Sequence, residues 1–226
     1  MTVHAFSRLL KTDLRNRRNT ILITLGALVP VHAALALLIM QQNFDKAQLS
    51  FVSTLNIAVY FSAMLLPFVY CFTAWREERR QRSIYLLLSL PIPRTHLLMS
   101  KSLAVGWEIL LISAVMAAGL TIQNGISDGL LFRTEPLITL NAAKIWFMLR
   151  ILLAAACLVF LCFFSTLLGA CFGKLSLLIT CLVFAVGLVV TIVAMANIQP
   201  FFVFAFFGLG YFGGSVYLLE KKVGVG

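Results

Sequence analysis

Long apolar runs separated by short polar segments make up most of this sequence. Six of these runs qualify as membrane spans, because a transmembrane helix needs roughly 20 apolar residues. They cover about residues 20–40, 51–74, 102–123, 145–172, 175–196 and 200–219. The polar segments between them are too short to close a core of their own. We therefore expect an all-α membrane protein with six transmembrane helices and no soluble domain.

The first 19 residues have the pattern of an amphipathic helix. Apolar and basic side chains recur at steps of three and four on different faces, Val3, Phe6, Leu10 and Leu14 on one and Arg8, Lys11, Arg15 and Arg18 on another. Such a helix lies in the membrane interface with its basic face toward the headgroups. We expect a cytoplasmic interfacial helix over residues 1–19, which anchors the topology or docks a partner. The six-span domain follows over residues 20–226, and its first apolar run exceeds the roughly 7–15-residue core of a signal peptide, so we expect that run to be retained.

The polar segment over residues 75–101 is charged where its surroundings are almost entirely apolar. Eight consecutive polar residues follow Trp75, and an apolar stretch comes next. Pro91 and Pro93 then prevent a helix from continuing. We expect a helix over about residues 76–89, lying against the cytoplasmic face between the second and third spans.

Charge is scarce in this chain and unevenly distributed. Hydrophobic residues make up 61% of the sequence and charged residues only 12%, whereas about a quarter of an average soluble sequence is charged. Fourteen of the 18 lysines and arginines fall in the N-terminal segment, the inner loops and the C-terminal tail, which places both termini in the cytoplasm and orients the chain in the inner membrane. The net charge of +10 therefore indicates contact with anionic lipid headgroups rather than with nucleic acid.

The sequence shows none of the residue patterns that enzymes and metal proteins use. The five cysteines lie in apolar runs without a CxxC pair, and the three histidines are scattered. There is no phosphate-binding P-loop and no nucleophile or zinc-protease motif. The glycines at positions 208, 210 and 213 match the letters of a dinucleotide fingerprint, but they lie inside a span. We expect no catalytic residues, no metal site and no cofactor bound by this chain.

The spans contain two further features, pairs of closely spaced glycines and a single acid. Small residues at a four-residue spacing let helix backbones approach closely in lipid, and the candidates are Gly169 with Gly173 and Gly210 with Gly214. They serve packing within the chain or contact with another subunit. Glu108 is the one acid well inside a span. Intramembrane acids are costly, so Glu108 either contacts a substrate or ion or is a satisfied packing acid.

Together these elements resemble the membrane-spanning permease subunit of a type-2 ABC exporter. The shared order is an amphipathic entry helix, two spans, a charged inner helix and four further spans. The closest local likeness lies in the inner segment. In chain order, this segment has an acidic pair (Glu77, Glu78), a small residue (Ser83), leucines with Ser-Leu-Pro (Leu87 to Pro91), an arginine (Arg94), a further leucine (Leu98) and a terminal lysine (Lys101). The chain departs from that pattern at Arg82, where many members have glycine, and in its short outer turn at residues 197–200.

The resemblance implies a coupling helix within residues 75–101 that seats in a cleft of an ATP-binding subunit. The candidate docking residues are Glu77, Glu78, Arg79, Arg82, Ser83 and Arg94. The two acids meet basic residues of that subunit, or they only balance arginines on their own helix. The resemblance also implies that two permease chains meet with their first, second and fifth spans around a shared pathway. Polar side chains in these spans are candidate lining residues, namely Ser53, Asn56, Ser62, Thr180 and Thr191, with Asn56 the strongest because an amide cannot satisfy all its groups on its own helix.

We therefore expect a permease subunit of an ATP-binding-cassette exporter that is not itself an enzyme. Its partners are ATP-binding-cassette ATPase subunits, a second permease chain (a copy or a related sibling) and membrane lipid. ATP and Mg²⁺ are expected in the ATPase. One alternative is a partnerless secondary transporter or membrane scaffold, which inverted repeats and matched broken helices favour. The other is a membrane-embedded lipid-modifying enzyme, which needs clustered acids or histidines, and the sequence shows neither pattern.

Overall fold

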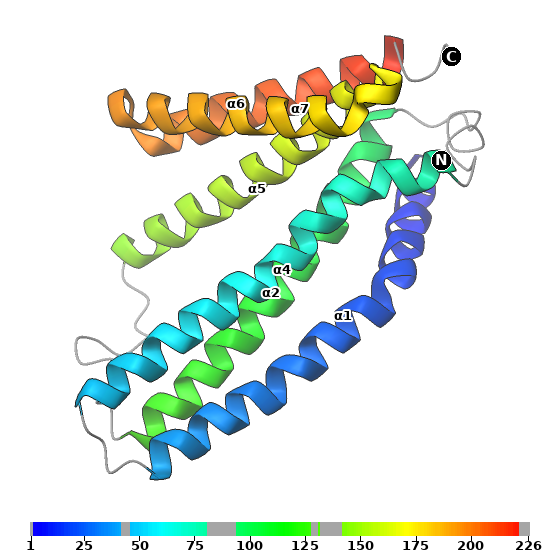
Figure 1. The fold of residues 1–226 in the computed structure, drawn as a ribbon. Helices are drawn as coiled ribbons and strands as arrows, with labels where there is room; N and C mark the ends of the chain where they lie inside the picture. The colour runs from blue at the N-terminus through cyan, green and yellow to red at the C-terminus, as the bar shows by residue number, and fades with distance from the viewer. Residues whose placement is uncertain (1, 42–45, 81–93, 128–130, 132–141, 222–226) are drawn as a thin grey trace. The chain divides into compact units, whose positions relative to one another are not determined.

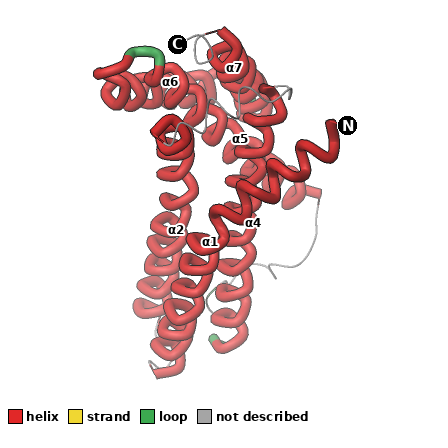
Figure 2. Tube along the Cα trace, turned by 90° about the vertical axis from the view of Figure 1, so that its right-hand side faces the viewer, coloured by secondary structure: helices red, strands yellow, loops and turns green. Residues whose placement is uncertain are grey.

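The computed structural model describes residues 2–41, 46–80, 94–127, 131 and 142–221. Within them, α-helices run over Thr2–Gln41 (α1), Lys46–Arg80 (α2), Arg94–Ile126 (α4), Ala142–Ala170 (α5), Ser176–Asn197 (α6) and Pro200–Lys221 (α7), with a short 3₁₀ helix at Gly173–Leu175 (η1) (Figure 1). This described part of the chain contains no strand (Figure 2). The predicted all-α fold is confirmed.

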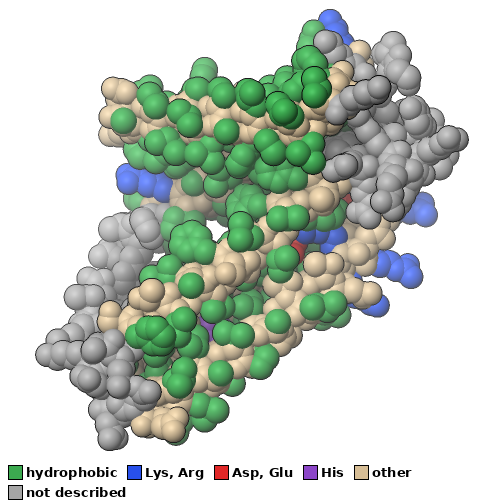
Figure 3. All heavy atoms as spheres, viewed as in Figure 1, with side chains coloured by type: hydrophobic (Ala, Val, Ile, Leu, Met, Phe, Trp, Pro, Cys, Tyr) green, Lys and Arg blue, Asp and Glu red, His purple; other side chains and the backbone are tan. Residues whose placement is uncertain are grey.

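Six helices of the described part are long and apolar enough to cross a membrane. The qualifying stretches are Phe6–Gln41, Leu49–Ala74, Thr95–Ile126, Met148–Ala170, Ser176–Asn197 and Pro200–Lys221, and each overlaps one of the predicted runs. Their outward side chains are largely apolar, with 72% of Ile23 and 76% of Phe206 exposed (Figure 3). Water rarely covers so much apolar surface, whereas lipid tails do so without cost. The chain is a multi-pass membrane protein.

The N-terminal segment and the first span form a single helix. α1 is helical from Thr2 to Gln41 with no break near residue 19. No glycine or proline occurs before Gly26, so nothing in the local sequence forces the helix to stop there. The backbone of α1 therefore shows no boundary between an interfacial helix and the first span, and the division at residue 19 stays a prediction.

The second span also continues past its apolar run. α2 remains helical through residues 75–80 and ends at Arg80. The start of the predicted coupling helix is thus a continuation of α2 rather than a separate element. Residues 81–93 lie outside the described part, so a helix over residues 76–89 stays a prediction.

The chain divides into two compact units. The smaller unit contains residues 14–67 and 107–141, and the larger contains residues 1–13, 68–106 and 142–226. In the smaller unit, parts of α1, α2 and α4 pack around an apolar cluster of Leu28, Ala63, Met64, Ile112 and Met116. α1 and α4 run in the same direction in this unit and α2 runs against them, as alternate crossings of a membrane require (Figure 1).

The core of the larger unit is α5 packed against α6 and α7. Phe163 and Leu167 of α5 are fully buried there. A Cβ atom at Gly169 would meet Thr180 and the Ser176 carbonyl of α6, and one at Gly214 of α7 would meet the Phe164 ring of α5. These two glycines therefore let the helices approach closely within the chain.

The other two glycines of the predicted packing steps have different surroundings. Gly173 begins η1 with a φ of +56°, a left-handed conformation that side chains other than glycine rarely adopt. A Cβ atom at Gly210 would meet no atom of the described residues within 4 Å. Neither glycine admits a neighbouring helix within the described part of this chain.

Candidate functional site

A buried ion pair joins α1 and α4 inside the smaller unit. Glu108 has no exposed surface, Arg17 is only 3% exposed, and the guanidinium of Arg17 contacts the Glu108 carboxylate. A buried charge is costly unless a partner of opposite sign meets it. Glu108 therefore has a partner of opposite charge, as expected for an acid that serves packing. A role of Glu108 in a substrate pathway stays a prediction.

Sequence reasoning missed the partner of Glu108. Arg17 lies in the N-terminal segment that the sequence pattern places in the membrane interface, outside the predicted spans. The available signal was the order of crossings, because the first and third spans cross in the same direction and their starts lie at the same side of the bilayer. Arg17 stands just before the first apolar run, so it was a natural partner for an acid near the start of the third.

The larger unit contains a second link between α1 and α4. Ser100 donates a hydrogen bond to the Asp13 carboxylate at 3.0 Å, and Lys101 Nζ lies 3.8 Å from the other carboxylate oxygen. Lys101 had been recognised only as the last residue of the inner-loop pattern. In the structure it ties the N-terminal segment to the third span.

A hydrogen-bonded chain of buried side chains joins all three helices of the smaller unit. Asn56 Nδ2 of α2 donates to Gln123 Oε1 of α4 at 2.7 Å. Gln123 Nε2 lies 3.1 Å from His32 Nδ1 of α1, and His32 Nε2 lies 3.1 Å from Met116 Sδ. Asn56 Nδ2 also donates to the Val52 carbonyl at 3.0 Å. Asn56 therefore does meet polar groups off its own helix, as an amide inside a span requires.

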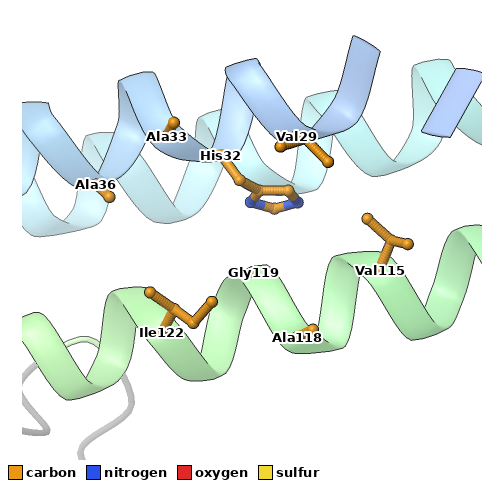
Figure 4. A pocket seen from close by; sticks show the side chains of 8 residues that line it. All are labelled: Val29, His32, Ala33, Ala36, Val115, Ala118, Gly119 and Ile122. Carbon is orange, nitrogen blue, oxygen red and sulfur yellow. The ribbon is translucent and has the colours of Figure 1, made fainter. Parts of the chain in front are cut away.

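His32 also lines a pocket between α1 and α4 (Figure 4). The pocket has a volume of about 330 Å³, and its other lining residues are apolar or glycine, namely Val29, Ala33, Ala36, Val115, Ala118, Gly119 and Ile122. The imidazole reaches from α1 toward Gly119, where an added Cβ atom would collide with the ring. A glycine at this position is what lets the histidine enter. Neither Gln123 nor Gly119 was singled out from the sequence, since Gln123 stands at the edge of its apolar run.

The remaining pathway candidates do not join this chain of side chains. Ser53 is half-buried and Ser62 exposed on α2. Thr180 and Thr191 belong to α6 in the larger unit and donate to carbonyls four residues earlier on their own helix, at 2.8 Å in each case. Thr191 also lies 3.2 Å from the hydroxyl of Tyr211. A role of these residues in a pathway stays a prediction.

The candidate docking residues stand at the edges of the described part. Glu77, Glu78 and Arg79 belong to the last turn of α2, and Arg94 is the first residue of α4, but their side chains are not described. Arg82 and Ser83 lie outside the described residues. Among the described residues, no group of three or more His, Cys, Asp or Glu side chains gathers closely enough to hold a metal ion.

Comparison with known protein families gives one match. A family model described as an ABC-2 family transporter protein matches residues 13–168, which is 156 of the 226 residues. The matched range begins in α1, includes all of α2 and α4 and ends near the end of α5. No match was found among curated proteins or among solved structures.

Proposed function

Because this chain belongs to the ABC-2 transporter family, we propose that it is the permease subunit of an exporter, working with a second permease chain and two ATPase subunits. The observation that carries the proposal is the family match, which extends over more than half of a chain with six membrane-spanning helices. Permeases of this family associate with ATP-binding subunits. The second chain is a copy of this one or a related sibling.

The proposed energy source is ATP hydrolysis in the partner subunits, which would hold ATP and Mg²⁺. The sequence of this chain has no P-loop of its own. The continuity of α2 supports mechanical coupling, because the helix extends six residues past Ala74 and thus about 9 Å beyond the apolar run. A helix that joins the loop to the span without a break can transmit a displacement between them.

We place both termini and the loop over residues 75–101 on the cytoplasmic side of the inner membrane, where the basic residues gather. A Gln81→Cys variant in a cysteine-free background is expected to react with a membrane-impermeant maleimide only after the cytoplasmic side is opened. The matched control is Thr134→Cys in the loop between the third and fourth predicted spans, on the opposite side of the membrane, which is expected to react in intact cells. Reaction of Gln81→Cys from outside in intact cells would contradict both the orientation and the docking role of the loop.

The acidic pair at the end of α2 is expected to contribute to ATPase docking. A desolvated charge pair loses about 2–5 kcal/mol when one member is removed, so the Glu77→Ala/Glu78→Ala double variant should co-purify with its ATPase at least about tenfold less well. If the acids only balanced arginines on their own helix, the loss would be a few tenths of a kcal/mol. The measurement is the yield of ATPase with the tagged permease from detergent-solubilised membranes.

Glu135→Ala provides the control for this experiment, because it removes an acid from the opposite side of the membrane. It should leave the ATPase yield unchanged. Normal co-purification and full ATP-dependent transport by the double variant would show that docking is not the role of Glu77 and Glu78.

A further inference from the structure

The strongly polar side chains of the six apolar runs lie almost entirely inside the chain. Four of them are buried, namely Glu108, Gln123, Asn56 and His32. Among the described residues of these runs, Arg150 is the one exposed side chain that is charged or has an amide or imidazole group. The outward faces therefore consist mainly of apolar and hydroxyl side chains, as the face drawn in Figure 3 illustrates.

The four buried groups are engaged with other polar groups of the same chain. The Glu108 carboxylate contacts the guanidinium of Arg17. Asn56 donates to Gln123 at 2.7 Å, and Gln123 Nε2 lies 3.1 Å from His32 Nδ1. Polar groups that are buried in an apolar environment are stable only with such partners. They are therefore not available to line a route along the surface of the chain.

The outward faces also offer few free backbone or hydroxyl groups. Thr54, Thr73 and Thr121 are exposed, but each donates to a carbonyl three or four residues earlier on its own helix. Each of the six spanning stretches is one unbroken α-helix, so its backbone groups bond within the helix. Transporters that bind ions often do so with the unwound backbone of an interrupted helix, and the spans described here contain no such interruption.

Arg150 of α5 does not by itself make a polar route. Its exposed neighbours Leu149 and Ile151 are apolar. A long basic side chain on a helix leans toward the N-terminal end of that helix and extends its charged group toward water or lipid headgroups. Passage of an ion needs polar groups at successive positions along the route, rather than a single cation.

A charged or strongly hydrophilic substrate must exchange its water shell for polar groups of the transporter. If two permease chains enclose the route, the lining comes from faces that are exposed in the single chain. Among the described residues, those faces carry no such set of polar groups. A face that meets only lipid is also apolar, so the assignment of a substrate class rests on the proposed function, in which at least one of these faces lines the route.

We propose that the substrate of this exporter is an uncharged lipophilic molecule that dissolves in the hydrocarbon of the membrane. Such a molecule needs no polar lining, because an apolar helix face and lipid tails are equivalent surroundings for it. Exposed aromatic rings, such as those of Phe51 and Phe61 on α2 and Phe206 on α7, offer it large areas of apolar contact. Ions, peptides and sugars are not substrates of this kind.

The polarity of the route can be measured with nitroxide spin labels on single-cysteine variants of the permease, in complex with its ATPase in lipid nanodiscs. The variants cover the exposed apolar positions of the six spans, for example Ile23→Cys, Phe61→Cys and Val189→Cys. Each label reports collisions with oxygen, which dissolves in lipid, and with a water-soluble nickel chelate. We expect oxygen collisions to dominate at every position, both without nucleotide and after trapping with vanadate. Arg15→Cys, exposed outside the apolar runs, is the control and should collide mainly with the chelate.

A stripe of span positions that collides mainly with the nickel chelate in either state would show a water-filled route and would overturn the proposed substrate class. The exporter function would survive that result if the ATPase still co-purified with the permease. Failure of the ATPase to co-purify would instead contradict the exporter function itself.

Pentamethyl-BODIPY and its disulfonate test the substrate class directly, because the two dyes share one scaffold and differ in two negative charges. The uncharged dye should raise the rate of ATP hydrolysis by the complex severalfold. The disulfonate should need at least about a hundredfold higher concentration for the same effect, since each charge is costly in an apolar site. The same ATPase without the permease gives the background. Equal potency of the two dyes, or no stimulation by the uncharged dye, would contradict the proposal.

Discussion

Replacing Arg17 with leucine is expected to destabilise the protein by about 3–5 kcal/mol, because the substitution leaves the Glu108 carboxylate buried without its partner. Glu108→Leu should have a similar effect by leaving the guanidinium buried. The double variant is expected to recover most of the lost stability, since two leucines pack well in an apolar span and leave no buried charge. The free energy of unfolding, measured by titration with SDS in mixed micelles, gives all three values.

Arg15→Leu is the matched control, because it removes the same charge from an exposed position two residues away on α1. Its effect should stay within about 0.5 kcal/mol. The pair would have no stabilising role if Arg17→Leu cost no more than Arg15→Leu. Additive losses in the double variant would likewise show that the two side chains are not coupled.

Gly169→Ala is expected to destabilise the packing of α5 against α6, although alanine is the better helix former by about 1 kcal/mol. The added methyl group would lie about 2.6 Å from the Ser176 carbonyl oxygen and 3.0 Å from the Thr180 amide nitrogen. These are backbone atoms, so no change of rotamer relieves the collision and the helices must separate. Overpacking of this kind costs about 1–3 kcal/mol, which a lower midpoint of thermal unfolding in detergent would report.

Two further variants separate backbone from side-chain effects in this experiment. Gly210→Ala, at a position where the methyl group meets no described atom within 4 Å, should not lower the unfolding temperature. Thr180→Ala combined with Gly169→Ala should remain unstable, because removing the threonine hydroxyl leaves the backbone contacts in place. Full recovery in that combination would show that the side chain, and not the helix backbone, limits the approach.

The spans were predictable because the chemistry that creates them is local. Each residue's transfer free energy depends on its own side chain, and a backbone in lipid must satisfy its hydrogen bonds within one segment. For this reason the six apolar runs overlap the six long helices of the structure. Helix ends were less predictable: α1 passes residue 19 and α2 passes residue 74, because neither place has a residue that interrupts a helix.

Contacts between spans depended on information that hydropathy does not contain. The sequence identified Glu108 and Asn56 as polar groups that needed partners, but it did not identify those partners. The hydrogen bond between Asn56 and Gln123 joins residues 67 positions apart, and the contact between Gln123 and His32 joins residues 91 positions apart. Which polar groups meet depends on which helices are neighbours and on the rotation of each helix about its axis.

By itself, the sequence determined that this is an all-α protein with six spans, because burial of a helix in lipid depends on the residues of that helix alone. Its inner-loop pattern indicated the ABC transporter family, because a short motif is also made of neighbouring residues. The tertiary structure decided that Arg17 neutralises Glu108 and that Gly169 and Gly214 bring helices together within the chain. It also decided that His32 stands between a hydrogen-bonded chain and an apolar pocket. The physical reason is that a charge, an amide or a glycine only specifies a requirement, and the packing of α1, α2 and α4 or of α5, α6 and α7 determines which residue meets it.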